Sequence, residues 1–300
     1  MKMNKIVSCA AIFLAASTAA FAQAGAPERL VTRPGERIEN VIETADGTLY
    51  MTGVFKGEVL RRAPDGKLDT LLTLHSPQGI LAYKNGFVVD WQLRDPNFTD
   101  PKGPSFANLG AQLSILDGKG KVLKTLSGPD DAAFFNGMAF SAPDTLMIAD
   151  PGGGRLLKAD LKKGAVTVWL DKPALVSALG ENGRPNGLKV HDGWVYFARG
   201  DVYKVLIGKD GGPSGAPVLA GKTGGTDDFD VAADGTIYTT SQKGILKITK
   251  DGAVSVFVAE APSATAVRVS RDGKSIFVVG GGVPVRPNPV DGYLIKVAIN

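Results

Sequence analysis

The sequence predicts an all-β fold, a six-bladed β-propeller closed by an N-terminal strand that completes the last blade. Three observations lead to this prediction. A strand–turn–strand pattern recurs along the chain, a second hairpin usually follows it, and the last repeat is one strand short. The composition agrees, because 38 glycines in 300 residues and an aromatic content of only 7% are typical of β-structure with many tight turns.

The first repeat begins with RIENVIETADGTLYMTG (37–53), in which an Asp-Gly turn joins two strands. Five later segments share this pattern: SPQGILAYKNGFVVDW from Ser76, FNGMAFSAPDTLMIAD from Phe135, PNGLKVHDGWVYFARG from Pro185, TDDFDVAADGTIYTTS from Thr226 and ATAVRVSRDGKSIFVVG from Ala264. Second hairpins follow, as in GEVLRRAPDGKLDTLL (57–72) and GILKITKDGAVSVFVA (244–259). One unit therefore has four strands in roughly 35–50 residues, the period of a propeller blade.

The two ends of the chain complement each other. The last repeat stops after its third strand, GYLIKVAI (292–299), and a spare strand, RLVTRP (29–34), precedes the first repeat. Pairing these strands would close the ring and remove an open sheet edge. The alternative is a β-sandwich of unrelated hairpins, but the regular spacing favours the propeller.

Residues 1–22 have the features of a secretory signal peptide: Lys2 and Lys5, an apolar stretch at 6–20, and the cleavage site Ala20-Phe21-Ala22. We therefore expect residues 23–300 to form one propeller domain that is periplasmic or secreted. No later stretch is long and apolar enough for a membrane span. Cys9 is the only cysteine, so the mature chain has no disulfide.

The charges are nearly balanced, with 34 basic residues, two of them in the signal peptide, and 30 acidic residues. This balance argues against nucleic acid as a partner. No partner protein is evident, so we expect a small-molecule ligand.

Aligning the six repeats places a polar residue just before each innermost strand, where it faces the mouth of the central channel. These residues are Glu39, Gln78, Asn136, Asn186, Asp227 and Thr265. Converging carboxylates and amides are costly to bury unpaired, and a hard divalent cation would satisfy them. Because all the donors are oxygen atoms, Ca²⁺ is favoured, Mg²⁺ or Mn²⁺ is possible, and Zn²⁺ is less suited. The alternative is a water-filled channel whose side chains hydrogen-bond to one another.

The repeats resemble the senescence-marker-protein / gluconolactonase / luciferin-regenerating-enzyme family of six-bladed propellers. The resemblance covers essentially the whole mature chain. It rests on Asn136-Gly137, Asn186-Gly187, the ADGTLY and ADGTIY turns, and the order Glu, Asn, Asn, Asp.

This resemblance implies that Glu39, Asn186 and Asp227 bind one catalytic divalent metal, with Asn136 as a further ligand or a hydrogen-bond donor to the substrate. It also implies hydrolysis of lactones or related esters, with the metal polarising the carbonyl and Asp227 helping to activate water. Glu39 and Asp227 are thus the predicted catalytic residues.

Two departures from the family pattern leave alternatives open. Asn40-Val41 stands where the family usually has Gly-Pro, and Asp227-Asp228-Phe229 stands where Asp-Gly is common. Asp228 could therefore be the ligand instead of Asp227, or both could point inward. Asn40 could also reach the mouth.

Longer segments should form the walls of the cleft. DWQLRDPNFTDPKGPSFANLGAQ (90–112) is expected to be a loop that acts as a lid, KPALVSALGENGRP (172–185) has helical character, and GGGVPVRPNPVDG (280–292) is a third wall. The predicted substrate-binding residues are Gln78, Trp91, Arg94 and His75. The alternatives to a metal-dependent lactone hydrolase are a non-catalytic propeller that binds a ligand or protein, and a strictosidine-synthase-like activity.

Overall fold

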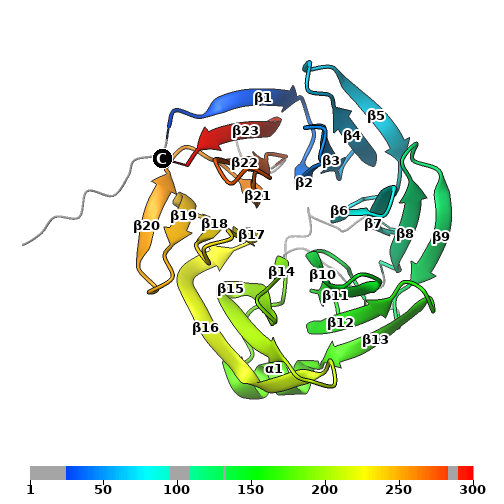
Figure 1. The fold of residues 1–300 in the computed structure, drawn as a ribbon, viewed down its shortest axis with the longest axis vertical. Helices are drawn as coiled ribbons and strands as arrows, with labels where there is room; N and C mark the ends of the chain where they lie inside the picture. The colour runs from blue at the N-terminus through cyan, green and yellow to red at the C-terminus, as the bar shows by residue number, and fades with distance from the viewer. Residues whose placement is uncertain (1–24, 95–108, 131–132, 283–289, 300) are drawn as a thin grey trace, which may run out of the picture.

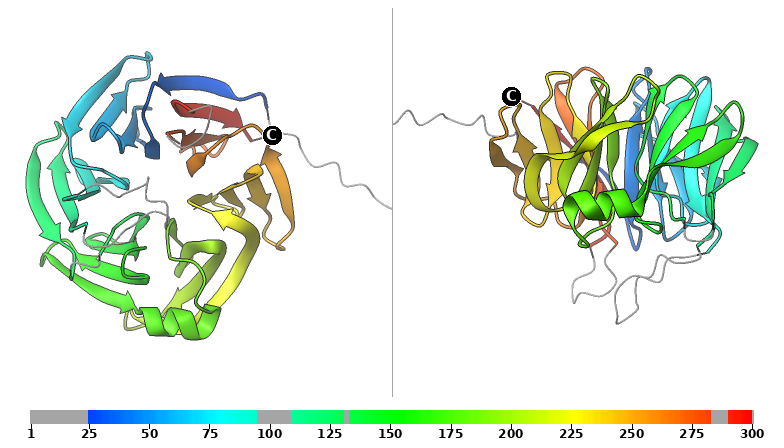
Figure 2. Two further views of the ribbon diagram at one scale, coloured as in Figure 1. Left: turned by 180° about the vertical axis from the view of Figure 1, so that it is seen from behind. Right: turned by 90° about the horizontal axis from the view of Figure 1, so that it is seen from below.

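The computed structural model describes residues 25–94, 109–130, 133–282 and 290–299. These residues form 23 β-strands and one α-helix, and the strands make six sheets arranged around a common axis (Figures 1 and 2). The predicted all-β six-bladed propeller is confirmed. The predicted signal peptide lies outside the described residues and stays a prediction.

Each blade is a small antiparallel sheet whose strands follow the chain from the axis outward. Blade 1 consists of β2 (Ile38–Glu43), β3 (Leu49–Gly53), β4 (Glu58–Arg62) and β5 (Leu68–Thr73). Blade 2 consists of β6 (Ile80–Tyr83), β7 (Gly86–Gln92), β8 (Ala111–Asp117) and β9 (Val122–Ser127). Blade 3 consists of β10 (Met138–Ala142), β11 (Thr145–Asp150), β12 (Arg155–Asp160) and β13 (Ala165–Leu170).

The second half of the ring follows the helix α1 (Lys172–Leu179), which lies in the predicted helical segment. Blade 4 consists of β14 (Leu188–His191), β15 (Trp194–Ile207) and β16 (Pro213–Thr226). Blade 5 consists of β17 (Phe229–Val231), β18 (Ile237–Ser241), β19 (Gly244–Ile248) and β20 (Val254–Val258). Blade 6 consists of β21 (Ala264–Val269), β22 (Ser275–Gly280), β23 (Gly292–Ala298) and the N-terminal strand β1 (Glu28–Arg33).

The ring closes as predicted, because β1 is the outermost strand of blade 6. It pairs antiparallel with β23, with Thr32 opposite Tyr293 and Arg33 opposite Gly292, and the two strands lie side by side in Figure 1. Arg33 also forms an ion pair with Glu58 of blade 1 (2.6 Å). The chain's first strand therefore holds the last blade beside the first.

The apolar core is divided among the blade interfaces. Six clusters of buried apolar side chains are present in the described residues, one between each pair of neighbouring blades. The cluster between blades 6 and 1, for example, joins Val31 of β1 to Met51 of β3 and Leu294 of β23. Each blade thus buries both faces against its neighbours, as an isolated sheet could not.

Two local features explain the element boundaries. In the ADGTLY turn, Asp46 Oδ1 accepts a hydrogen bond from Thr48 N (3.1 Å), while Gly47 has φ of 78°, a conformation that favours glycine. The helix α1 starts at the N-cap Asp171, whose side chain accepts from Ala174 N (2.8 Å), and ends at Gly180. It is the only helix in the described part of the chain, and it is too short to cross a membrane.

Blade 4 differs from the predicted set of four separate strands. Ile207 N donates to Gly193 O (2.9 Å), so the single strand β15 folds back on itself near Gly200, which has φ of 77°. The last residues of β16 then lead directly to Asp227.

We predict that Val31→Asp destabilises the protein by about 3 kcal/mol or more, because it buries a carboxylate in the apolar cluster that closes the ring. Thr32→Asp is the matched control. Its side chain is exposed on the same strand, so its effect should stay within about 0.5 kcal/mol. Urea unfolding followed by circular dichroism measures both, and equal effects would contradict the closing role of β1.

Candidate functional site

Five of the six predicted polar residues meet at one mouth of the ring. A cavity of about 410 Å³ is lined by Glu39, Gln78, Asn136, Asn186 and Asp227. The sixth residue, Thr265, instead donates to the backbone carbonyl of Ile38 (2.6 Å) and links blade 6 to blade 1.

Two Asn-Gly pairs bring neighbouring blades close together at this mouth. Gly137 N donates to Asn186 O (3.1 Å), and Gly187 N donates to Asp227 O (2.9 Å). A Cβ atom on Gly137 would overlap the backbone of Asn186, and one on Gly187 would overlap Asp228. The glycines therefore permit the close approach that places Asn136, Asn186 and Asp227 around one cavity.

The two carboxylates at the mouth share one guanidinium group. Arg37 Nε lies 2.7 Å from Glu39 Oε2, and Arg37 Nη2 lies 3.4 Å from Asp227 Oδ2. The remaining oxygen of each carboxylate accepts from an amide: Glu39 Oε1 from Asn136 Nδ2 (3.3 Å) and Asp227 Oδ1 from Asn186 Nδ2 (2.5 Å). The sequence did not assign Arg37 to the site, although this residue stands only two positions before Glu39.

Burial, followed by the negative charge of Glu39, raises the pKa of Asp227 to about 8, although the positive charge of Arg37 opposes this shift. The Asp227 side chain keeps 26% of its surface exposed, whereas Glu39 keeps 5%. Asp227 is therefore the carboxylate that a molecule in the cavity can reach.

The donor set fits a hard divalent cation. It offers two carboxylates and two amides, all with oxygen donors, which is the chemistry that Ca²⁺ prefers. Moreover, Asn186 Oδ1 is buried and has no hydrogen-bond partner among the described residues. A buried unpaired carbonyl oxygen is costly, and a cation in the cavity would relieve that cost.

Asp228 does not face this cavity. Its Oδ1 lies 2.6 Å from Lys189 Nζ, and its Oδ2 lies 3.0 Å from Arg268 Nη1. Asn40 is part of the same buried network, because its Oδ1 accepts from Arg268 Nη2 (2.9 Å). The geometry therefore places Asp227 beside Glu39 at the mouth, and it places Asp228 and Asn40 deeper along the axis.

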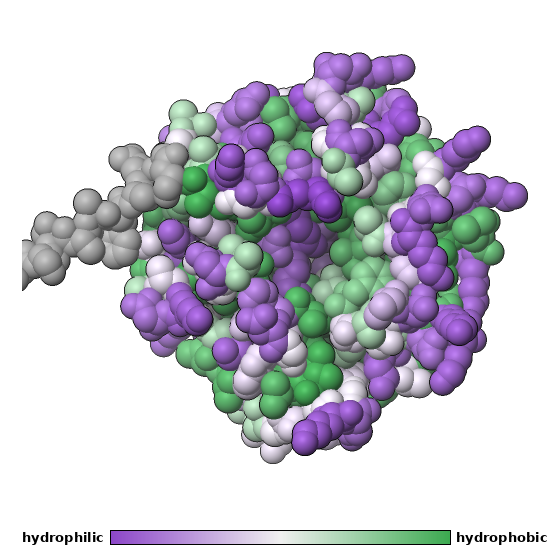
Figure 3. Space-filling view, in the orientation of Figure 1, coloured by the Kyte–Doolittle hydropathy of each residue, from purple (hydrophilic) through white to green (hydrophobic). Residues whose placement is uncertain are grey.

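Lys189 and Arg268 also line a cavity of about 310 Å³ at the opposite end of the axis, together with Glu43 and Asp230. Figure 3 shows this face, which is hollowed at its centre and has hydrophilic side chains on its floor. Burial, followed by the neighbouring positive charge of Arg268, lowers the pKa of Lys189 to about 8. A charged layer thus lies between the two cavities.

The other predicted substrate-binding residues lie apart from the mouth cavity. Trp91 belongs to strand β7 and not to the connecting loop, and its Nε1 donates to Ser114 Oγ (2.9 Å). His75 lines a separate cavity of about 330 Å³ between blades 1 and 2, with Nδ1 3.1 Å from Gln92 O. Arg94 is exposed, and its backbone N–H donates to Leu109 O (3.1 Å). Their roles in substrate binding stay predictions.

Gln78 does line the mouth, and its Nε2 donates to Ser76 O and Oγ (both 3.1 Å). Arg184 also lines it, a residue that sequence reasoning did not single out; its Nη1 donates to Pro151 O (3.1 Å). The segments 95–108 and 283–289, which include most of the predicted lid and Arg286, lie outside the described residues.

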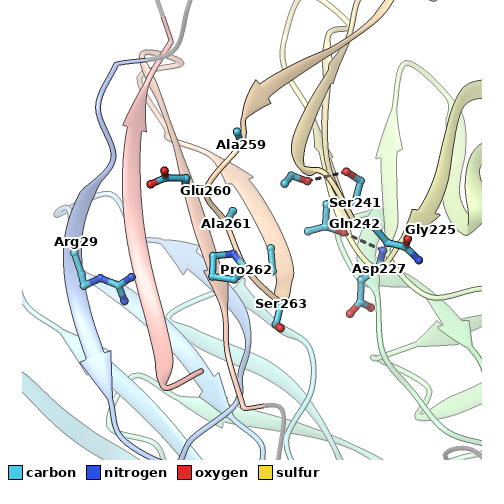
Figure 4. A pocket seen from close by; sticks show the side chains of 13 residues that line it. Arg29, Gly225, Asp227, Ser241, Gln242, Ala259, Glu260, Ala261, Pro262 and Ser263 are labelled. Atoms are coloured by element: carbon cyan, nitrogen blue, oxygen red, sulfur yellow. Dashed lines mark hydrogen bonds between the residues drawn. The ribbon is translucent and has the colours of Figure 1, made fainter. Parts of the chain in front are cut away.

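A larger cavity of about 990 Å³ adjoins the mouth between blades 5 and 6, and the two cavities share Gly225 and Asp227. Figure 4 shows Asp227 and Gln242 on the blade 5 side and Arg29 on the blade 6 side, with the connection 259–263 between them. Its lining is largely polar, so it can accommodate hydrophilic groups of a ligand whose reacting part lies at Asp227.

We predict that Asp228→Asn destabilises the protein by about 3–5 kcal/mol, because it leaves Lys189 and Arg268 buried without their counterion. Chemical unfolding at pH 7 measures the change. A loss below about 1 kcal/mol would show that the buried cations do not depend on Asp228.

Asp227→Asn should have the opposite effect on stability and should stabilise the ion-free protein. In the ion-free wild type, the folded state keeps the Asp227 proton up to pH of about 8, whereas the unfolded chain releases it near the ordinary pKa of 3.8. Wild-type stability therefore falls as pH rises between these values. The Asn variant lacks this loss and should be more stable by about 1–3 kcal/mol at pH 7, with little difference at pH 4. Unfolding in the presence of a chelator at both pH values tests this, and a destabilised variant at pH 7 would contradict it.

No family model and no curated protein matches the sequence. Solved structures do match the fold. A gluconolactonase from Xanthomonas campestris has a TM-score of 0.68 at 15% identity, covering 91% of this chain and 89% of the other. A calcium-binding protein, regucalcin from Agrobacterium tumefaciens, has 0.69 at 15% identity, covering 92% and 93%. Virginiamycin B lyase from Staphylococcus aureus has 0.58 at 13% identity, covering 88% and 80%. At these identities the similarity is one of fold, and the chain has the six-bladed propeller architecture of the gluconolactonase and regucalcin structures, as the sequence resemblance predicts.

Proposed function

We propose that the protein hydrolyses a lactone or a related ester with the help of one divalent cation, most favourably Ca²⁺, at the mouth of the propeller. Glu39, Asn136, Asn186 and Asp227 would hold the ion. The observation that carries the proposal is the convergence of two carboxylates and two amides from blades 1, 3, 4 and 5 on one cavity, where Asn186 Oδ1 has no hydrogen-bond partner among the described residues.

A divalent cation in this position would act as a Lewis acid on the ester carbonyl and lower the pKa of bound water. The chain's own residues have separate tasks. Asp227, exposed at the rim and oriented by the Asn186 amide, is placed to accept a proton from the attacking water. Gln78 lines the wall against which the substrate would be oriented.

Two of the structural neighbours support the substrate class and the ion, since one is a gluconolactonase and another is a calcium-binding protein. The lyase neighbour shows that the same fold also serves a different reaction, so the proposal depends on the site and not on the fold. We further propose that the protein is periplasmic or secreted and acts on a small hydrophilic molecule, which the polar lining of the 990 Å³ cavity suits.

The second candidate is a non-catalytic propeller that binds a ligand at its mouth. The ion pairs of Arg37 favour it, because they already satisfy one oxygen of each carboxylate without a metal.

We predict that the metal-stripped protein binds one Ca²⁺ and gains thermal stability, and that Glu39→Gln abolishes both effects. Glu43→Gln is the matched control. Glu43 lies on the same strand but at the opposite end of the axis, so this variant should bind like wild type. Isothermal titration calorimetry and thermal unfolding measure binding.

Hydrolysis of a panel of five- and six-membered lactones tests the reaction. Glu39→Gln and Asp227→Asn should each lower kcat/KM by about 100-fold or more, because Glu39 would hold the ion that stabilises the developing oxyanion and Asp227 would accept the proton of the attacking water. Metal binding without hydrolysis of any lactone or ester would favour the non-catalytic propeller.

A further inference from the structure

Arg37 lies where a cation between Glu39 and Asp227 would lie. Its Nε and Nη2 reach one oxygen of each carboxylate, at 2.7 and 3.4 Å. These two side chains are also the only charged members of the proposed ligand set. The guanidinium and a divalent ion therefore depend on the same pair of negative charges.

The charge balance at the mouth does not favour both cations together. With both carboxylates ionised, as ion binding requires, Arg37, Glu39 and Asp227 carry a net charge of −1, and a divalent ion added with Arg37 in place would change it to +1. The Arg37 side chain is only 21% exposed, so two cations a few ångströms apart would repel each other with little screening by water.

The backbone of Arg37 is held firmly, so the side chain is the part that can move. Arg37 O accepts from Val54 N (2.9 Å), and Arg37 N donates to Glu36 Oε1 (2.8 Å). Gly282 of blade 6 packs so closely that a Cβ atom there would overlap Arg37. The guanidinium, by contrast, borders the mouth cavity of about 410 Å³ and has room to turn within it.

We infer that Arg37 is a built-in competitor for the divalent ion: its guanidinium pairs with Glu39 and Asp227 when no ion is bound, and ion binding displaces it into the mouth cavity. This inference rests on the proposed use of a divalent ion by the same site. Arg37 thus sets the affinity of the site for the ion, and ion binding would turn its guanidinium from Glu39 and Asp227 towards a substrate or product carboxylate.

The test is a Ca²⁺ titration of the metal-stripped full mature protein by isothermal titration calorimetry, with wild type, Arg37→Met and Arg184→Met. Arg37→Met should bind Ca²⁺ at least about tenfold more tightly than wild type, because the competing cation is gone. Arg184→Met is the matched control. Arg184 lines the same cavity, but its Nη1 donates to Pro151 O and not to either carboxylate, so the Ca²⁺ affinity of this variant should stay within about threefold of wild type.

Arg37→Lys provides a second variant that keeps the charge and the long side chain. An ammonium group cannot pair with both carboxylates through a planar fork, so its Ca²⁺ affinity should lie between those of wild type and Arg37→Met. If Arg37→Met does not fold, tighter binding by Arg37→Lys supports the inference and unchanged binding overturns it.

The outcomes separate this inference from the proposed function. Equal Ca²⁺ affinity in wild type and Arg37→Met, with binding lost in Glu39→Gln, would overturn the competition and leave the ion site intact. If Arg37→Met binds Ca²⁺ and wild type does not, the result would support the competition. It would show that the guanidinium excludes the ion from the wild-type site. Absence of binding in every variant would overturn both the competition and the proposed ion.

Discussion

Closure of the ring by β1 is the constraint on which the rest of the structure depends. Each blade has two apolar faces that only neighbouring blades can cover, and Val31 belongs to the cluster that joins the last blade to the first. Closure also aligns the innermost strands so that they all start at one mouth. Glu39 of blade 1 and Asp227 of blade 5 share one guanidinium because the ring brings them together. The site is therefore a property of the closed ring and of no single blade.

The charged side chains near the propeller axis lie in two layers. Asp227 belongs to the layer at the mouth, with Glu39 and Arg37, while the next residue, Asp228, belongs to a buried layer with Lys189 and Arg268. Successive residues of an extended chain point in opposite directions, so one dipeptide serves both layers. The side chains of the inner layer are paired with one another, whereas the outer layer has a partly exposed carboxylate and an amide oxygen without a hydrogen-bond partner among the described residues.

Much of the architecture could be predicted because it follows from periodic local signals. The hairpin repeat, the Asp-Gly turns, the spare strand before the first repeat and the polar residues before the innermost strands are all visible in the sequence. The sequence does not show in which direction a long side chain points or how far it reaches. The bridging position of Arg37 depends on the approach of blades 1 and 5, and the partners of Asp228 come from blades 4 and 6. The assignment of Trp91 to a loop was wrong because β7 continues to Gln92, beyond the last turn signal.

The guanidinium between the two mouth carboxylates has a consequence for the order of events during maturation. In small zinc domains, folding waits for the metal, because metal binding supplies the free energy of folding. Here Arg37 serves as the counterion of both carboxylates, so the ring can assemble without a metal. Under the proposed use of a divalent ion, the chain would finish folding in a compartment poor in calcium and acquire the ion later, elsewhere, without passing through an unfolded intermediate.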